Sequence, residues 1–198
     1  LEKLIEDLFG FTKMNYGKIS MNIGKVDIVK LLGQLLEEFY PSFKDKNLSY
    51  ELQSNVPGKV ITADGNLLAR LFDNLINNAI NYTSKEDKQV FVTQRNLPQC
   101  VRIEVRDTGD GIEEDKIKLI FDKYYRSENH KREVVGTGLG LSIVKEILKM
   151  HNYNYGVNSK LGEGSTFWFE IRDIRFTRAV PPEKPEDEEI PDAEIRQL

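Results

Sequence analysis

Apolar residues recur at helical spacing in four parts of the chain. Positions three and four residues apart are apolar in these segments, which predicts amphipathic helices at residues 1–17, 27–40, 64–82 and 139–150. Asp27 is suited to cap the second helix, and Pro41 is expected to mark its far end. The apolar face of residues 1–17 needs a packing partner, so this segment is expected to be the end of a longer helix.

Shorter apolar runs between turn residues predict strands at residues 48–53, 59–62, 89–95, 100–106, 153–159 and 165–171. In the fourth of these, Val101, Ile103 and Val105 alternate with charged residues, so one face of the strand is expected to be wet. The order of elements predicts an α+β fold. We expect a two-layer sandwich over residues 18–174, in which a mixed, mostly antiparallel sheet carries the helices on one face.

Composition is ordinary for a globular protein, but charge is unevenly distributed. Of 198 residues, 39% are apolar and 30% are charged, and the net charge is −4. Residues 181–198 hold seven acids and two bases, a net charge of −5, so the remainder sums to about +1. These totals show no excess of positive charge of the kind that attracts nucleic acid. The acidic, proline-rich residues 175–198 are expected to form a disordered tail.

The few cysteines and histidines restrict the possible chemistry. Cys100 is the single cysteine, which excludes an internal disulfide and a cysteine-based zinc site and fits a reducing cytoplasm. His130 and His151 are interpreted as structural or solvated. The chain begins with Leu1 and shows no apolar run long enough to span a membrane, so we expect a fragment whose upstream part could hold such spans.

Asparagines are concentrated on one helix. Asn74, Asn78 and Asn81 follow the spacing i, i+4, i+7 and therefore share a face of the predicted helix 64–82. Each costs up to about 0.7 kcal/mol relative to alanine in a helix. Their carboxamides offer oxygens to a hard cation and N–H groups to phosphate. The alternative is an ordinary solvated polar face.

A glycine turn at residues 107–112 follows a predicted strand. Asp107 comes first, and glycines occupy the third and fifth positions, which excludes a calcium loop of the EF-hand type. A carboxylate fixed there could accept a hydrogen bond from an exocyclic amino group and so select adenine over guanine. The alternative is a simple loop, because Asp and Gly are favoured in turns.

A second glycine run, residues 136–141, opens a helix. It is neither a P-loop nor a dinucleotide fingerprint, but its free N–H groups at a helix N-terminus suit phosphate. About two dozen residues separate the two glycine runs, and such long loops are often lids or simply solvated. A third turn, residues 162–166, reads as an ordinary hairpin turn with a hydroxyl that could reach a pocket.

Together and in this order, these motifs resemble the catalytic ATP-binding domain of sensor histidine kinases, in the wider family of gyrase, Hsp90 and MutL. The resemblance covers residues 1–171 and includes an asparagine box, a phenylalanine box and three glycine boxes, at residues 74–83, 121–126, 107–112, 136–141 and 162–167. Residues 1–17 resemble the end of the dimerisation hairpin that precedes such domains. The resemblance implies a Bergerat-type ATP-binding fold.

The resemblance also implies roles for individual residues, with ATP and Mg²⁺ as ligands. Asn78 would ligate magnesium, and Asn74 and Arg126 would act on the phosphates. Asp107 would accept the adenine amino group, and Thr166 would lie near the base. The remaining contacts would come from Tyr82, Gly109, Gly111, Ile112, Tyr125, Gly136, Thr137, Gly138, Leu139, Gly140 and Leu141.

Two departures accompany the resemblance. Asn81 stands where many members carry a lysine that touches the phosphates, and His151-Asn152-Tyr153 replaces a His-Gly-Gly sequence. Neither histidine has the phosphoacceptor motif, so the acceptor histidine is expected on the missing part of the hairpin.

The resemblance thus implies a protein-histidine kinase domain that binds ATP without labelling itself. Its expected partners are a dimer mate and a response regulator, and nucleic acid is not expected among them. The domain would be the cytoplasmic part of a protein that is anchored in the cell membrane. The alternatives are an anti-sigma-type serine kinase and a nonenzymatic nucleotide-gated interaction module.

Overall fold

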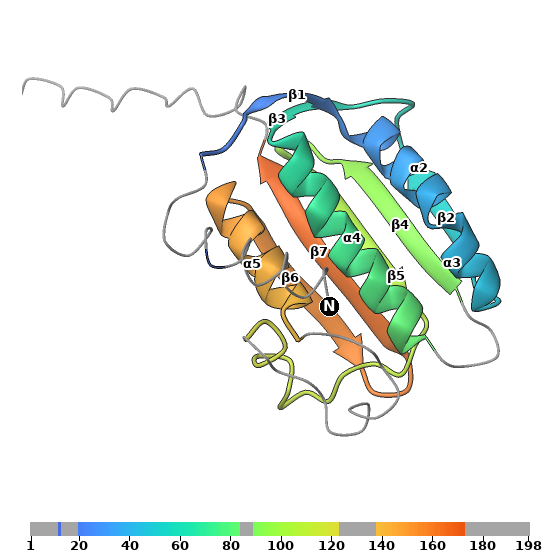
Figure 1. The fold of residues 1–198 in the computed structure, drawn as a ribbon. Coiled ribbons are helices and arrows are strands. Elements are labelled where there is room, and N and C mark those ends of the chain that lie inside the picture. The colour runs from blue at the N-terminus through green and yellow to red at the C-terminus, as the bar shows by residue number, and fades with distance from the viewer. Residues whose placement is uncertain (1–11, 13–19, 84–88, 123–137, 173–198) are drawn as a thin grey trace, which may run out of the picture.

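A five-stranded sheet with helices on one face organises the molecule (Figure 1). This computed structural model describes residues 12, 20–83, 89–122 and 138–172. The strand order is β2 (Ser49–Ser54), β4 (Gln89–Asn96), β5 (Cys100–Asp107), β7 (Gly164–Arg172) and β6 (Asn154–Lys160). The β2–β4 pair is parallel and the other three pairs are antiparallel. The predicted α+β class and the mixed, mostly antiparallel sheet are therefore confirmed.

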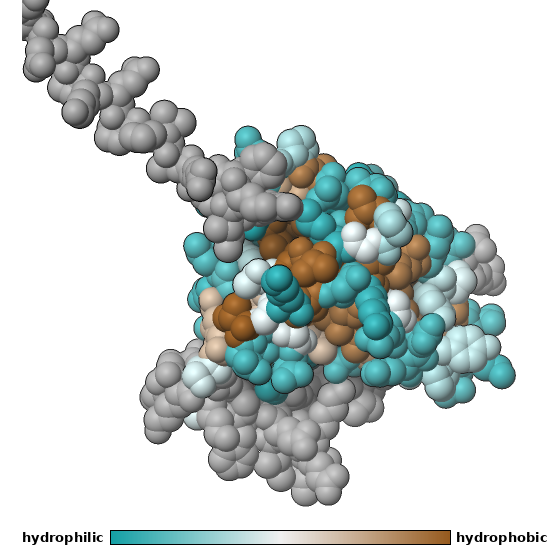
Figure 2. All heavy atoms as spheres, turned by 90° about the horizontal axis from the view of Figure 1, so that it is seen from above, coloured by the Kyte–Doolittle hydropathy of each residue, from teal (hydrophilic) through white to brown (hydrophobic). Residues whose placement is uncertain are grey.

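Three helices, α2 (Ile28–Glu38), α4 (Gly65–Tyr82) and α5 (Gly140–Met150), cover one face of this sheet (Figure 1). Two strands that the sequence did not predict to pair, β1 (Gly24–Asp27) and β3 (Val60–Ala63), form a separate antiparallel ribbon. Viewed from the end of the molecule at which this ribbon lies, apolar atoms gather near the centre of a hydrophilic surface (Figure 2).

Side-chain caps fix the starts of two helices. Asp27 accepts hydrogen bonds from the amides of Val29 and Lys30 at the start of α2, as predicted. Asp64 does the same for α4. The prediction that Pro41 ends the second helix was wrong in detail. That helix ends at Glu38, and Pro41 lies in the first turn of α3 (Tyr40–Asp45), where its missing N–H costs nothing.

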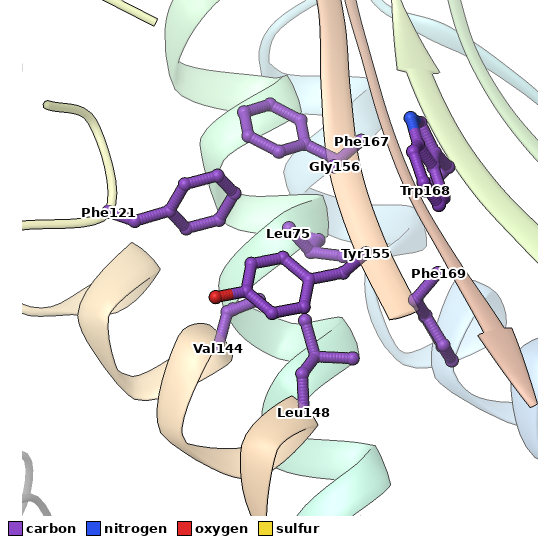
Figure 3. A pocket seen from close by; sticks show the side chains of 9 residues that line it. All are labelled: Leu75, Phe121, Val144, Leu148, Tyr155, Gly156, Phe167, Trp168 and Phe169. Carbon is purple, nitrogen blue, oxygen red and sulfur yellow. The ribbon is translucent and has the colours of Figure 1, made fainter. Parts of the chain in front are cut away.

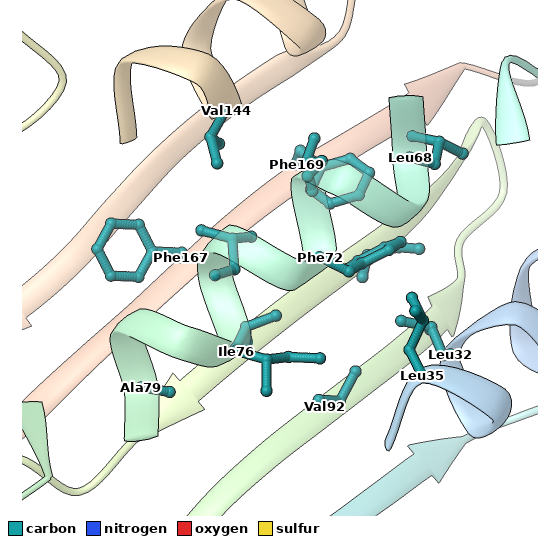
Figure 4. Close-up of a cluster of buried hydrophobic side chains, with 14 of the residues drawn as sticks. Leu32, Leu35, Leu68, Phe72, Ile76, Ala79, Val92, Val144, Phe167 and Phe169 are labelled. Atoms are coloured by element: carbon teal, nitrogen blue, oxygen red, sulfur yellow. The ribbon is translucent and has the colours of Figure 1, made fainter. Parts of the chain in front are cut away.

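The core lies between α4 and the sheet (Figure 4). The predicted apolar stripe of α4 is buried and consists of Leu68, Leu71, Phe72, Leu75, Ile76 and Ala79. The Phe72 ring lies 5.7 Å from that of Phe169 on β7. Burial of these large side chains at about 25 cal/mol per Å² holds α4 against the strands that carry the site.

The opposite face of the sheet is only partly wet. The Arg102 guanidinium lies 4.2 Å from the centre of the Trp168 ring and pairs with Glu104 and Glu170, each at 2.8 Å. Gly156 leaves space for this indole, since a Cβ atom there would lie 2.6 Å from it. Val101, Ile103 and Val105 fill the helix-facing side of the same strand, as their alternation predicted.

A small cavity lies between α4, α5 and the last two strands, with room for about one water molecule (Figure 3). Its lining is apolar and includes Leu75, Phe121, Val144 and Tyr155. Within the described ranges, none of the residues expected to bind nucleotide lines this cavity. The same ranges include no helix with the length and hydropathy needed to cross a membrane.

Candidate functional site

Asp107 is a buried carboxylate at the end of β5. Its exposed fraction is 5%, and it lies on the helix-facing side of the sheet. The amides of Gly109 and Ser165 donate to the same oxygen, Oδ1, at 2.9 and 3.3 Å. Burial raises the pKa of Asp107 to about 6, against the partly compensating effect of these two bonds. At neutral pH the group is therefore largely ionised and still has Oδ2 to offer to a ligand.

The glycine turn after Asp107 is held against the C-terminal end of α4. The amide of Asp110 donates to the carbonyl of Tyr82, the last residue of the helix, at 3.2 Å. A Cβ atom at Gly109 would overlap that same carbonyl. The first glycine therefore permits close contact between turn and helix, whereas the sequence suggested only contact with a ligand.

The second half of the turn is held against the β6–β7 hairpin. Gly111 has a φ of 71°, and a Cβ atom there would overlap the carbonyl oxygen of Lys160. Gly162 donates to the Asp110 carbonyl at 2.7 Å, and the half-buried Ile112 donates to Ser159 Oγ at 2.8 Å. The turn is thus fixed on both sides by the neighbouring backbone.

Strand register places Ser165, and not Thr166, beside Asp107. Ser165 is the direct partner of Asp107 across β5 and β7, and it is buried with an exposed fraction of 7%. Thr166 pairs with Arg106 and lies on the opposite face of the sheet. Ser165 therefore adjoins the carboxylate, whereas the sequence analysis gave Thr166 a place near the base.

The asparagines of α4 divide into two kinds. Asn74 donates to the carbonyl of Arg70 at 2.8 Å, and Asn77 donates to that of Asp73 at 2.7 Å. Asn78 and Asn81 are half-buried, and within the described part of the chain neither side chain makes a hydrogen bond. The carboxamide of Asn78 is therefore available to a ligand, as a metal ligand must be.

The start of α5 lies against Asn74. A Cβ atom at Gly140 would lie 3.0 Å from Asn74 Oδ1, so the glycine permits this approach. Gly138 has a φ of 70°, Leu139 is buried and Leu141 is half-buried. The side chain of Leu139, the N-cap residue, makes no capping hydrogen bond. The fold thus brings the asparagine helix and the second glycine run together. Gly136, Thr137, Tyr125 and Arg126 lie outside the described residues.

Two serines that support the site were not identified as such from sequence. Ser165 was noticed only within a hydroxyl-bearing turn, and Ser159 carried no signal of its own. Both lie on the helix-facing side of the sheet, in register with Asp107. The alternation of buried and exposed residues along the last two strands is the pattern that would have placed them there.

Comparison with known proteins extends these observations. The family model of the histidine kinase-, DNA gyrase B-, and HSP90-like ATPases matches residues 63–175. Drug sensory protein A of Synechocystis is 35% identical over 86% of this chain and 27% of its own length. Full-length ShkA, crystallised with AMPPNP, aligns with a TM-score of 0.76 and 29% identity, covering 85% of this chain and 35% of that one.

A second solved structure shows the same fold. The histidine kinase ThkA, in complex with the response regulator protein TrrA, has a TM-score of 0.66 and 20% identity, covering 86% of this chain and 48% of that chain. This chain matches less than half of the length of curated relatives, with shares that run from 9% to 46% of the relative. The family match includes the asparagine helix, Asp107 and the glycine runs, and the chain belongs to the histidine kinase-, DNA gyrase B-, and HSP90-like ATPases, as a catalytic domain of the sensor histidine kinase type.

Proposed function

We propose that this domain binds ATP with magnesium and transfers the γ-phosphoryl group to a histidine of a dimerisation hairpin, for relay to a response regulator. The observation that carries the proposal is the Asp107 carboxylate, which is buried and has both amide bonds on Oδ1. An ionised carboxylate only accepts hydrogen bonds. It therefore suits the 6-amino group of adenine and repels the 6-oxo group of guanine.

The phosphates would lie between α4 and α5. Magnesium commonly takes one or two protein oxygens together with phosphate oxygens and waters. The carboxamide of Asn78, which makes no hydrogen bond among the described residues, suits that role. When bound, the ion would neutralise charge on the phosphates. The first turn of α5 lies close to Asn74, and its backbone N–H groups would orient the phosphates.

The remaining expected contacts belong to the proposal as well. Tyr125 and Arg126 would approach the nucleotide from the segment between the glycine runs, and Gly136 and Thr137 would donate backbone N–H groups. Arg126 and Asn74 would position the γ-phosphoryl group for in-line attack by the imidazole. The general base would be an acid beside the acceptor histidine, as the family resemblance implies.

Partners and location follow from the same proposal. A dimer mate would supply or complete the hairpin, and a response regulator would receive the phosphoryl group from the histidine. The related kinase ThkA has been crystallised with a response regulator, which supports the second partner. The domain would act in the cytoplasm as part of a membrane-anchored sensor.

A binding titration tests the nucleotide part of the proposal. The chain is titrated with a nonhydrolysable ATP analogue and a GTP analogue, with and without magnesium, and compared with Asp107→Asn. We expect saturable binding that prefers adenine and is lost in the variant. Absence of binding by the wild-type chain at millimolar nucleotide would overturn the proposal.

A phosphorylation assay tests the reaction. The chain is mixed with labelled ATP and a hairpin fragment that contains an acceptor histidine. Acid-labile phosphate on the hairpin supports histidine kinase activity, and acid-stable phosphate on a protein substrate supports a serine kinase instead. Nucleotide binding without transfer to any acceptor supports a nucleotide-gated interaction module.

A further inference from the structure

Three polar side chains stand in a row across the sheet at the candidate base site. Asp107 on β5 is the direct partner of Ser165 on β7, and Ser165 is the direct partner of Ser159 on β6. All three lie on the helix-facing side, where the neighbouring positions are apolar. Such a row needs internal hydrogen bonds, because unpaired polar groups in a half-buried position are costly.

Ser159 is saturated with hydrogen bonds. Its hydroxyl donates to the carbonyl of Gly164 at 2.9 Å and accepts from the amide of Ile112 at 2.8 Å. Its oxygen also lies 2.9 Å from Ser165 Oγ. A hydroxyl has one proton and two lone pairs. Since the proton of Ser159 is used on Gly164, the Ser165 hydroxyl must be the donor in the contact between the two serines.

This arrangement fixes the polarity of the site. With its proton directed at Ser159, the Ser165 hydroxyl can offer a ligand only acceptor lone pairs. The ionised Asp107 carboxylate also only accepts. The row therefore presents acceptors without a donor, which matches an amino group and opposes a carbonyl oxygen.

We propose that Ser159 is a positioning residue for adenine selectivity, which acts by holding the proton of Ser165 and the amide of Ile112. This inference rests on the proposed nucleotide site and adds a residue to it. Without the Ser159 hydroxyl, the Ser165 proton is free to turn toward a guanine carbonyl. The Ile112 end of the turn also loses its bond to β6.

The test compares Ser159→Ala, Ser159→Thr and Asn158→Ala in the full chain. Threonine keeps the hydroxyl, and Asn158 is an exposed neighbour on the other face of the same strand. Affinities for nonhydrolysable ATP and GTP analogues are measured with magnesium, and melting temperature confirms folding. We expect Ser159→Ala to reduce the ratio of the two affinities by about 3- to 10-fold, the effect of one hydrogen bond. Ser159→Thr and Asn158→Ala should keep the wild-type ratio.

Amide exchange at Ile112 gives a second readout that needs no nucleotide. Exchange should be faster in Ser159→Ala and unchanged in Ser159→Thr. The inference is wrong if Ser159→Ala lowers the affinities for both analogues equally. It is also wrong if the substitution changes neither affinity nor the Ile112 exchange rate. In both cases the proposed nucleotide site stands. If wild type binds neither analogue, the proposed function fails, and the inference fails with it.

Discussion

The imidazole of His151 joins the C-terminal end of α5 to the N-terminal end of α4. Its Nε2 accepts a hydrogen bond from the amide of Asp64 at 3.1 Å, and Nδ1 lies 2.9 Å from the carbonyl of Ile147. A carbonyl only accepts, so the proton must be on Nδ1 and the ring is neutral. The interpretation of His151 as a structural residue is therefore confirmed, and the same bonds make it sensitive to pH.

We expect the domain to lose stability when His151 becomes protonated. Burial lowers the pKa of His151 from its ordinary value of 6.5. The unfolded chain therefore takes up a proton at a higher pH than the folded chain. The contribution of neutral His151 to the free energy of unfolding is therefore fully present above pH 6.5 and declines as the pH falls below that value.

The substitution His151→Gln tests this expectation, because a Gln carbonyl can accept from Asp64 and does not titrate in this range. Urea unfolding of both proteins is measured between pH 7.5 and pH 5, conditions chosen to bracket the ordinary histidine pKa. The wild-type chain should lose more stability than the variant over this interval. Equal losses in the two proteins would contradict the assignment.

Asp107 is expected to act on stability in the opposite direction. Its folded pKa of about 6 exceeds the ordinary value of 3.8, so the folded chain binds the proton more tightly. The free energy of unfolding should therefore decrease as the pH rises from about 4 to about 6 and stay at the lower value above that. At neutral pH the ionised Asp107 therefore lowers the free energy of unfolding by about 2–3 kcal/mol, the equivalent of this pKa shift.

Asp107→Asn should therefore make the chain more stable at pH 7 while removing adenine binding. The carboxamide oxygen can still accept from Gly109 and Ser165, so the turn keeps its bonds. Thermal and urea unfolding at pH 4, 5, 6 and 7 measure the effect. A variant less stable than wild type at pH 7 would show that the carboxylate is needed for the fold itself.

Much of the fold could be predicted from local patterns. The apolar stripe of α4 and the alternation in β5 are signals within single elements, and both correctly gave the buried side chains. The face of β5 expected to be wet is only partly exposed. The role of Pro41 was ambiguous, because proline is favoured both after one helix and in the first turn of the next. The pairing of β1 with β3 joins short segments far apart in sequence, and no local pattern specifies such a partner.

The candidate site shows the same limit at the level of single residues. Asp107 was identified because it follows a predicted strand and opens a glycine turn, a position that fixes its carboxylate at the end of the strand. Strand register decides that Ser165, and not Thr166, lies beside Asp107, because each step along a strand moves the side chain to the other face. Alternation could place Ser159 on the helix-facing side, but its bonds to Ile112, Gly164 and Ser165 depend on how the glycine turn and the hairpin meet, which no local pattern specifies.

The conformation of Gly111 predicts a large effect of a single methyl group. Gly111→Ala would place a Cβ atom on the Lys160 carbonyl at a positive φ, so the turn must move. We expect a loss of about 2–4 kcal/mol in the free energy of unfolding, from backbone strain and overpacking together. Gly24→Ala is the matched control, since among the described residues no atom beyond its own chain neighbours lies within 4 Å of its Cβ position.

Urea unfolding of both alanine variants measures the difference. Gly24→Ala should stay within about 0.5 kcal/mol of wild type, as surface substitutions usually do. Gly111→Ala should also weaken nucleotide binding, because the turn carries Ile112 and adjoins Asp107. Similar stability of the two variants would show that the turn can relax without cost.

The asparagines of α4 allow binding to be separated from stability within one helix. Asn78 makes no hydrogen bond in the described part of the chain, whereas the neighbouring Asn77 donates to Asp73. Alanine is favoured over asparagine in helices by up to about 0.7 kcal/mol. We therefore expect Asn78→Ala to leave stability unchanged or slightly increased while it removes the part of ATP affinity that depends on magnesium.

Asn77→Ala is the control, because it changes the same residue type one position away without removing the proposed metal ligand. Affinity for the nonhydrolysable ATP analogue is measured for both variants with magnesium and with EDTA, and melting temperatures are measured alongside. Magnesium should strengthen binding in wild type and Asn77→Ala and have little effect in Asn78→Ala. If magnesium strengthens binding equally in all three, another group holds the ion. Asn78 would then be a polar residue of α4 that does not bind magnesium.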